Sequence, residues 1–225
     1  KSDATWLAHL LRLNILPTGY IYPRHTRPIR DLLRKRLQLV QQRTKNLLSV
    51  KSFYARYLGE NISTNEFNRN PSSFLPTQPE LKAILFPSIS ICTLLAGQIA
   101  SIEKQIVKGH FKDSSHFNLL KSVPGIGNLL AITILLEIGD ITRFKAVGNF
   151  VSYCRCVDSQ KISNQKVKGK GNVKNGNRYL SWAFHEAAHH ALIWSQPIKS
   201  FYERKKRKTN GMIAIRAVAH KLARA

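Results

Sequence analysis

Two long stretches of the chain repeat apolar residues three and four positions apart, the spacing of a helix that buries one face. The first runs from about Thr26 to Leu58 and has Pro28 near its start, where a helix tolerates proline. The second occupies most of residues 80–106 and carries the series Leu81, Leu85, Ser88, Cys92, Leu95, Ile99, Ile102 and Ile106. Because this series alternates steps of four and three, it matches the spacing of a coiled coil.

The two helices predict a long antiparallel coiled-coil hairpin over residues 26–115. The hairpin either packs on itself or joins two subunits, and an ordinary two-helix layer of a globular domain explains the pattern equally well. Residues 59–79 are rich in Asn, Ser, Thr and Pro, so we expect a loop there. Residues 1–25 read as an amphipathic helix followed by an extended exit. We therefore predict a mainly α chain in three parts, 1–25, 26–115 and 116–225.

The pattern changes to short helices near Phe117, and residues 119–140 read as helix, tight turn, helix. The turn contains Gly125 and Gly127. A glycine turn of this kind can present backbone N–H groups and a helix N-terminus to a phosphate, where a side chain would obstruct the approach. A helix-hairpin-helix that binds nucleic acid and a purely structural αα-corner both fit this segment.

Basic residues gather in two later segments. Residues 158–178 contain Asp158 as their one acid, interleave glycine and asparagine with cations, and are predicted to form a phosphate-binding loop. The cations are Lys161, Lys166, Lys168, Lys170, Lys174 and Arg178. A helix follows from about 177 to 194, and its periodicity predicts a buried face of Leu180, Ala183, Phe184, Ala187, Ala188, Ala191 and Leu192. After it a basic helix carries Lys205 and Lys206, which can hold backbone phosphates without reading sequence.

The overall charge favours a polyanionic partner. The 225 residues include 36 Lys and Arg against 12 Asp and Glu, a formal net charge of +24, and a hydrophobic fraction of 43% that supports a real core. Nucleic acid is the expected partner. We find no uninterrupted apolar run that would span a bilayer and no secretory signal. The three cysteines form no zinc spacing and suit a reducing cytoplasm.

His185, Glu186 and His189 form the pattern H-E-x-x-H, which on a helix can bind zinc in a metalloprotease. A third ligand at metalloprotease spacing is missing from the sequence, and Glu203 lies beyond Pro197 on another predicted helix. We therefore expect these histidines to line the polar edge of a packed helix rather than to hold zinc.

Four stretches resemble the insertion-sequence transposases of family one-ten, the DEDD-type recombinases related to the Piv and MooV invertases. They are KSDATWLAHLL at the start, VPGIG at 123–127, RF at 143–144, and the long block FVSYCRCVDSQKISNQKVKGKGNVKNGNRYLSWAFHEAA at 150–188. The resemblance implies the end of a RuvC-like α/β domain, then a coiled-coil region, then a C-terminal transposase domain. Since the chain starts at Lys1, we expect it to lack most of the RuvC-like domain.

The resemblance also implies the chemistry. Ser163 takes the place of the family's serine nucleophile, which glycine usually follows; here Asn164 and Gln165 follow, and Ser159 is the alternative. Asp3 takes the place of the last carboxylate of the DEDD set, which binds Mg²⁺ in the complete enzyme. One carboxylate cannot hold that ion, so we expect this chain alone to be inactive and to carry no cofactor.

The resulting hypothesis is a cytoplasmic bacterial DNA transposase, in which a structured guide RNA selects DNA and a homo-oligomer forms through the coiled coil. Lys161, Lys166 and Lys168 would flank the serine and hold the phosphate. The alternative is a non-catalytic module that coats DNA or RNA with the same basic surfaces, because both hypotheses predict salt-sensitive binding.

Overall fold

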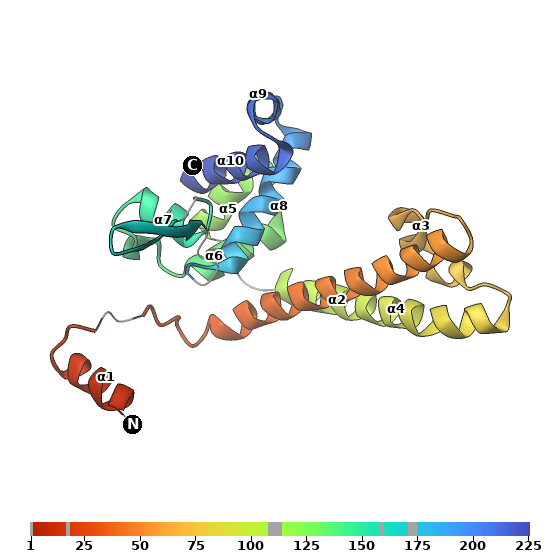
Figure 1. Cartoon of the computed structure of the whole chain (residues 1–225), viewed down its shortest axis with the longest axis horizontal. Helices are drawn as coiled ribbons and strands as arrows, with labels where there is room; N and C mark the ends of the chain where they lie inside the picture. The colour runs from red at the N-terminus through yellow and green to blue at the C-terminus, as the bar shows by residue number, and fades with distance from the viewer. Residues whose placement is uncertain (1, 17–18, 108–113, 158–159, 171–174) are drawn as a thin grey trace.

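The chain is built mainly of helices, as the periodicity predicts. The computed structural model describes residues 2–16, 19–107, 114–157, 160–170 and 175–225, and for 160–162 and 170 the backbone alone (Figure 1). Within these ranges helices dominate, and the strands are a single short pair. A compact group of helices lies at one side of the molecule, and a long helical pair extends away from it.

The long pair consists of α2 (Arg27–Tyr57) and α4 (Pro79–Val107), which lie side by side and run in opposite directions (Figure 1). Arg36 and Glu103 form an ion pair of 2.7 Å between them. The buried residues of α2 are Leu33, Leu37, Leu47, Val50, Phe53 and Tyr54; those of α4 are Leu85, Ile89, Cys92 and Ile106. The antiparallel hairpin is thus present, while its coiled-coil character stays a prediction.

The connection at 59–79 is more ordered than the loop that its composition predicted. It contains α3 (Thr64–Arg69) and the 3-10 turn η1 (Pro71–Phe74). Phe67 is fully buried and packs with the facing side chains of α2 and α4 in a small separate core. The Tyr54 hydroxyl donates to the Phe74 carbonyl at 2.6 Å. A few apolar anchors among polar residues were therefore enough to fold the segment.

Helix α4 is the one helix among the described residues that is long and apolar enough to cross a membrane, by length and composition alone. Small polar residues interrupt its apolar run, so that the sequence shows no uninterrupted run, but the helix carries no charge between Lys82 and Glu103. Part of the apolar surface of α4 is buried against α2 and α3, through Leu85, Ile89 and Cys92. The outer face remains exposed at Ile84, Phe86, Ile91 and Leu94.

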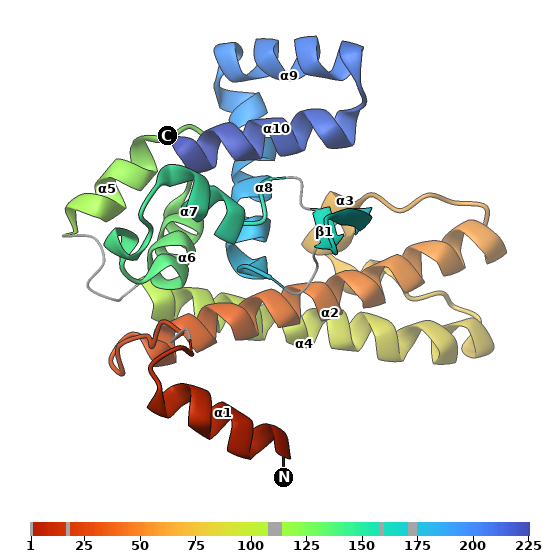
Figure 2. The same ribbon diagram turned by 60° about the vertical axis from the view of Figure 1, so that its left-hand side comes forward.

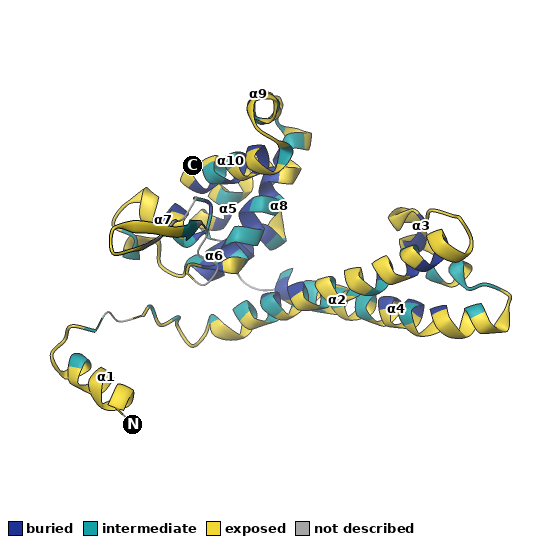
Figure 3. Cartoon of the chain, in the orientation of Figure 1, coloured by how far each residue is buried: buried dark blue, intermediate teal, exposed yellow. Residues whose placement is uncertain are grey.

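The compact unit is formed by α5 (Ser115–Ser122), α6 (Asn128–Ile138), the 3-10 turn η3 (Ile141–Arg143), α7 (Val147–Tyr153), α8 (Arg178–Trp194), α9 (Gln196–Lys208) and α10 (Gly211–Arg224). Figure 3 shows the buried residues concentrated where α6, α8 and α10 meet. The buried face of α8 consists of Leu180, Ala183, Phe184, Ala187, Ala188 and Ala191, as the periodicity predicted, whereas Leu192 is only half-buried. Alanines let neighbouring helices approach closely, so α8 serves as the centre of this core.

The basic segment after α7 contains a β-hairpin where a loop was predicted. Strand β1 (Gln160–Ser163) pairs antiparallel with β2 (Lys166–Lys170). The two turn residues, Asn164 and Gln165, have φ of 49° and 59°. Positive φ at both central residues defines a type I′ turn, the two-residue turn whose twist matches that of the flanking strands. Asparagine tolerates a positive φ.

The N-terminal region consists of α1 (Ser2–Arg12), which has no buried residue, and an extended segment that docks on the compact unit. The guanidinium of Arg143 lies 4.5 Å from the centre of the Tyr20 ring. Gly139 has φ of 71°, and the Tyr20 ring occupies the space that its Cβ would need. The origin of residues 1–25 in a RuvC-like domain stays a prediction, as do the three domain boundaries.

All three cysteines are buried free thiols. Cys154 and Cys156 belong to the main core and act there as packing residues. Burial raises the pKa of Cys156 to about 11 and also raises the pKa values of Cys92 and Cys154. Each thiol therefore stays protonated and unreactive in the folded chain near neutral pH.

The glycine turn between α5 and α6 packs directly on α8. Gly125 has φ of 90°, and a Cβ on it would collide with the carbonyl oxygen of Ala187 and lie 2.6 Å from the nitrogen of Ala191. Gly127 precedes α6 as its N-cap, has φ of −85°, and has open space where a Cβ would stand. Gly125 is therefore required by both its backbone conformation and its packing on α8, whereas the geometry at Gly127 leaves room for a side chain.

We predict that Gly125→Ala lowers the free energy of unfolding by roughly 2 kcal/mol or more, because it combines an unfavourable φ with a collision against helix backbone. Gly127→Ala is the matched control and should change stability far less. Urea unfolding followed by circular dichroism measures both. Equal losses for the two variants would contradict the packing role of Gly125.

Candidate nucleic-acid interface

Ser163 lies at the tip of the β-hairpin. It ends β1 and is paired in register with Lys166, while Ile162 pairs with Val167; an irregularity between Lys161 and Ile162 leaves Lys168 outside the regular pairing. Residues 163–168 are all exposed. In Figure 2 the hairpin stands apart from the helices of the compact unit. The serine hydroxyl is thus presented to solvent close to ammonium groups that can neutralise a phosphate.

The chain leaving the hairpin is fixed to the end of α7. Arg155 donates through Nε to the carbonyl of Asn175 at 2.7 Å and through Nη2 to the carbonyl of Gly176 at 3.1 Å. The backbone N–H of Asn177 donates to the carbonyl of Tyr153 at 2.6 Å. These bonds hold residues 175–177, which lead into α8, at one place on the compact unit.

Asn177 links this attachment to a buried carboxylate. Its Oδ1 caps α8 by accepting from the backbone N–H groups of Tyr179 and Leu180, at 2.8 and 3.2 Å. Its Nδ2 donates to Oε2 of Glu137 at 2.7 Å. Glu137 is only 1% exposed and lies in α6, whose other residues are almost entirely apolar. A single asparagine therefore joins the start of α8 to the core of the unit.

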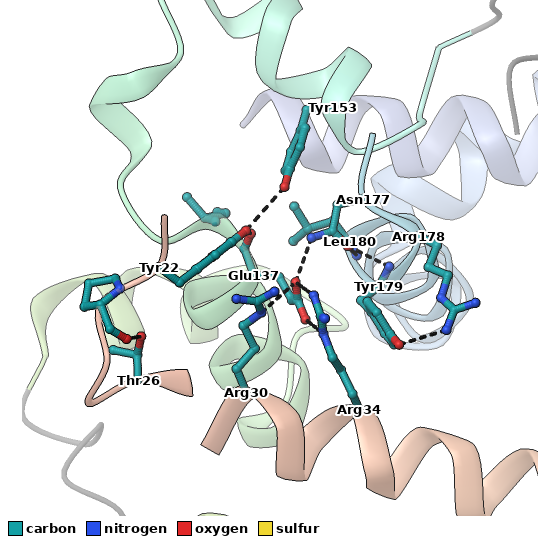
Figure 4. A network of polar contacts seen from close by, with 12 residues as sticks. Tyr22, Thr26, Arg30, Arg34, Glu137, Tyr153, Asn177, Arg178, Tyr179 and Leu180 are labelled. Atoms are coloured by element: carbon teal, nitrogen blue, oxygen red, sulfur yellow. Dashed lines mark hydrogen bonds and ion pairs between the residues drawn. The ribbon is translucent and has the colours of Figure 1, made fainter. Parts of the chain in front are cut away.

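Two arginines of α2 reach the same carboxylate (Figure 4). Arg34 donates from Nε and Nη2 to the two oxygens of Glu137, at 2.6 and 2.7 Å. Arg30 lies one helical turn earlier, with its Nε 3.5 Å from Oε2. The hydrogen bonds to Glu137 raise the pKa of Arg34. A bidentate pair of this kind fixes both position and orientation, so α2 is oriented on the compact unit by its charge partner.

The N-terminal segment completes the network. The Tyr22 hydroxyl donates to the backbone carbonyl of Glu137 at 2.6 Å and lies 3.3 Å from the Tyr153 hydroxyl. The Arg30 guanidinium stacks 3.6 Å from the centre of the Tyr22 ring. Burial raises the pKa of Tyr22, which keeps its hydroxyl a donor at neutral pH. We call Glu137 with Tyr22, Arg30, Arg34 and Asn177 the Glu137 network.

The other predicted contact residues are dispersed. Arg178 begins α8 beside the Glu137 network and donates to the Tyr179 hydroxyl at 2.9 Å. Lys205 and Lys206 lie in the last turn of α9, at a different side of the compact unit from the hairpin (Figure 2). The strands contain Lys161 and Lys170, whose side chains lie outside the described residues. Ser159 and Lys174 also lie outside them.

Asp3 is exposed on α1. Among the described residues no group of three or more His, Cys, Asp or Glu side chains could hold a metal ion. His185 uses its Nδ1 in a 2.7 Å hydrogen bond with the Ser181 carbonyl of its own helix. The described residues therefore do not supply the several oxygen ligands that Mg²⁺ requires.

Sequence reasoning missed the Glu137 network. One signal was present: Glu137 is the single acid in an otherwise apolar helix, and a buried acid needs a cation. Arg30 and Arg34, four residues apart on one face of α2, were candidate partners. The pairing itself joins residues 103 positions apart in the chain, which no local pattern reveals.

Comparison with known proteins gives a match over the compact unit. Residues 117–203 match the model of the family described as Transposase IS116/IS110/IS902. This span includes Glu137, Ser163 and Asn177, together with the hairpin and all of α8.

Two curated relatives are similar to part of this chain. An uncharacterized 44.8 kDa protein of insertion element IS116 from Streptomyces clavuligerus is 22% identical over 118 residues, which is 50% of this chain and 30% of that protein. An uncharacterized 43.6 kDa protein of insertion element IS110 from Streptomyces coelicolor is 27% identical over 88 residues, 39% of this chain and 22% of that protein. The matches thus cover less than a third of either relative's length. Together with the family match, these similarities support the assignment of the chain to an insertion-sequence transposase.

We predict that Glu137→Ala lowers the free energy of unfolding by about 3–5 kcal/mol, because it leaves the half-buried Arg34 and Arg30 without their anion. Glu103→Ala is the matched control: it removes the partner of Arg36 from a more exposed ion pair and should cost within about 1 kcal/mol. Urea unfolding measures both variants. A loss for Glu137→Ala no larger than for Glu103→Ala would show that the network does not hold the units together.

Proposed function

We propose that this chain is part of a DNA transposase of a bacterial mobile element, one that cuts and rejoins DNA through Ser163 and is guided by a structured RNA. The observation that carries the proposal is the exposed Ser163 on its basic hairpin within the span that matches the transposase family. The net charge of +24 supports a nucleic-acid substrate.

In the proposed reaction the Ser163 Oγ attacks a DNA phosphorus. The Oγ–P bond forms, one P–O bond to a deoxyribose breaks, and the departing sugar oxygen takes up a proton. Lys166 pairs in register with Ser163, and Lys168 follows on the same strand. Both would neutralise the phosphate oxygens, which would otherwise repel the nucleophile. A second strand's hydroxyl then displaces the serine and restores the phosphodiester.

The serine also needs a base, and the flanking lysines are cations at neutral pH. We place that base in the DEDD domain of the complete enzyme, to which Asp3 would contribute one carboxylate. Mg²⁺ belongs to that same complete site, because Asp3 alone does not provide its ligands. This chain by itself is therefore proposed to be inactive.

Other parts of the proposal concern partners. The exposed apolar residues of α4, Ile84, Phe86, Ile91 and Leu94, support a homo-oligomer formed through the long hairpin. Such an oligomer would bring the serine of one subunit to the DEDD domain of another. Gly127 and the N-terminus of α6, with Lys205 and Lys206 on α9, are proposed as contacts to nucleic-acid phosphates. A transposase of this kind would act in the bacterial cytoplasm.

A second candidate is a non-catalytic DNA- or RNA-binding module. The lack of a carboxylate cluster among the described residues favours it. Salt-sensitive binding does not separate the two candidates, because both use phosphate contacts. Covalent chemistry does separate them.

We predict a denaturation-resistant protein–DNA adduct that depends on Ser163. The protein for the assay carries a complete DEDD domain ahead of Asp3 and is incubated with magnesium, element-end DNA and the element's non-coding RNA. Ser163→Ala should abolish the adduct, while Ser159→Ala, four positions earlier in the sequence, should retain it. Denaturing electrophoresis with labelled DNA measures the yield.

The opposite result for the two serines would place the nucleophile at Ser159. If DNA binds and neither the parent nor either variant forms an adduct, the non-catalytic module becomes the better proposal.

A further inference from the structure

A cleft of about 570 Å³ opens between α2 and the first turns of α8. It belongs neither to the hairpin tip nor to the glycine turn. Its walls are formed chiefly by Lys35, Gln38, Gln41, Arg178, Tyr179 and Trp182. Cations, amides and aromatic rings on one concave surface are the combination that proteins use for unpaired bases.

The aromatic wall is held rigidly. Tyr179 lies between two guanidinium groups, with Arg34 at 4.4 Å and Arg178 at 4.9 Å from its ring centre. Arg34 is itself fixed by its bidentate bond to Glu137. Figure 4 shows Arg34, Tyr179 and Arg178 adjacent at the start of α8. Trp182 follows Tyr179 by three residues and is half-buried, so it faces the same side of the helix.

The opposite wall is polar and comes from α2. Gln38 and Gln41 are exposed, three residues apart, and present amide donors and acceptors along one helix face. Lys35 donates to Gln38 Oε1 at 3.3 Å and brings a cation to the cleft. Asp31 is the acidic residue on the wall. The α2 side can therefore read the edge of a base that stacks against α8.

We propose that this cleft binds an unpaired nucleotide of a single-stranded nucleic acid. Its base lies against Trp182, its edge meets Gln38 and Gln41, and its phosphate is held by Arg178 with Lys35. The volume lies within the range of small-ligand clefts. A base within a duplex cannot enter, because both of its faces are already stacked.

The cleft lies beside a fixed point of the chain. Arg178 follows Asn177 directly, and Asn177 is held by Glu137 and by the carbonyl of Tyr153. This inference rests on the proposed function for nucleic-acid binding, but not on the serine reaction.

The test uses Trp182 as its own reporter. The chain contains three tryptophans, so Trp6→Phe with Trp194→Phe leaves Trp182 alone. The full chain is titrated with a 12-residue oligothymidylate, an oligouridylate of the same length and a blunt DNA duplex. We expect both single strands to quench Trp182 fluorescence and the duplex to leave it unchanged; a difference between the two single strands assigns the cleft to DNA or RNA.

Two variants and a control locate the effect. The double variant Gln38→Ala/Gln41→Ala changes two exposed residues and leaves the core intact. It should weaken single-strand binding about tenfold, as should Arg178→Ala. Lys82→Ala removes an exposed cation near the start of α4, at the far end of the long helical pair, and should have little effect.

Fluorescence anisotropy of labelled oligonucleotides gives the binding independently of Trp182. Single-strand binding without quenching, or equal quenching by the duplex, would overturn the cleft proposal and leave the proposed function standing. If anisotropy detects no nucleic acid bound at all, the cleft and the proposed function fail together.

Discussion

The structure depends on one buried charge. Glu137 lies in the most apolar helix of the chain, where an ionised carboxylate is stable only with a cation and further hydrogen bonds. Arg34 and Asn177 supply these from α2 and from the start of α8, and Tyr22 binds the adjoining backbone. Three regions that the sequence separates are therefore required to meet at one point, and the orientation of the long hairpin relative to the compact unit follows.

This interaction also organises the candidate sites. Asn177 joins Glu137 to the start of α8, because the same side chain donates to the carboxylate and caps that helix. Arg34 joins Glu137 to the cleft, because its guanidinium lies against the ring of Tyr179. The start of α8 and the wall of the cleft are thus positioned by the same carboxylate.

What could be predicted from the sequence was what local pattern determines. Periodicity gave the two long helices, the buried alanine face of α8 and the mainly α fold, because each depends on residues a few positions apart. It missed α3, which depends on the burial of Phe67 by distant helices, and the β-hairpin, whose lysines and glycines read as a loop. It missed the partners of Glu137 because they lie 40 and 103 positions away. Ser163 was found through resemblance, since an exposed serine has no pattern of its own.

The burial of the three cysteines has a practical consequence. Their raised pKa values and lack of exposure leave the native chain without a reactive thiol. A cysteine introduced at an exposed position of the hairpin would be the one site open to maleimide or disulfide chemistry. Fluorophores, spin labels or tethered oligonucleotides could then be attached beside Ser163 without removing any native residue from the core.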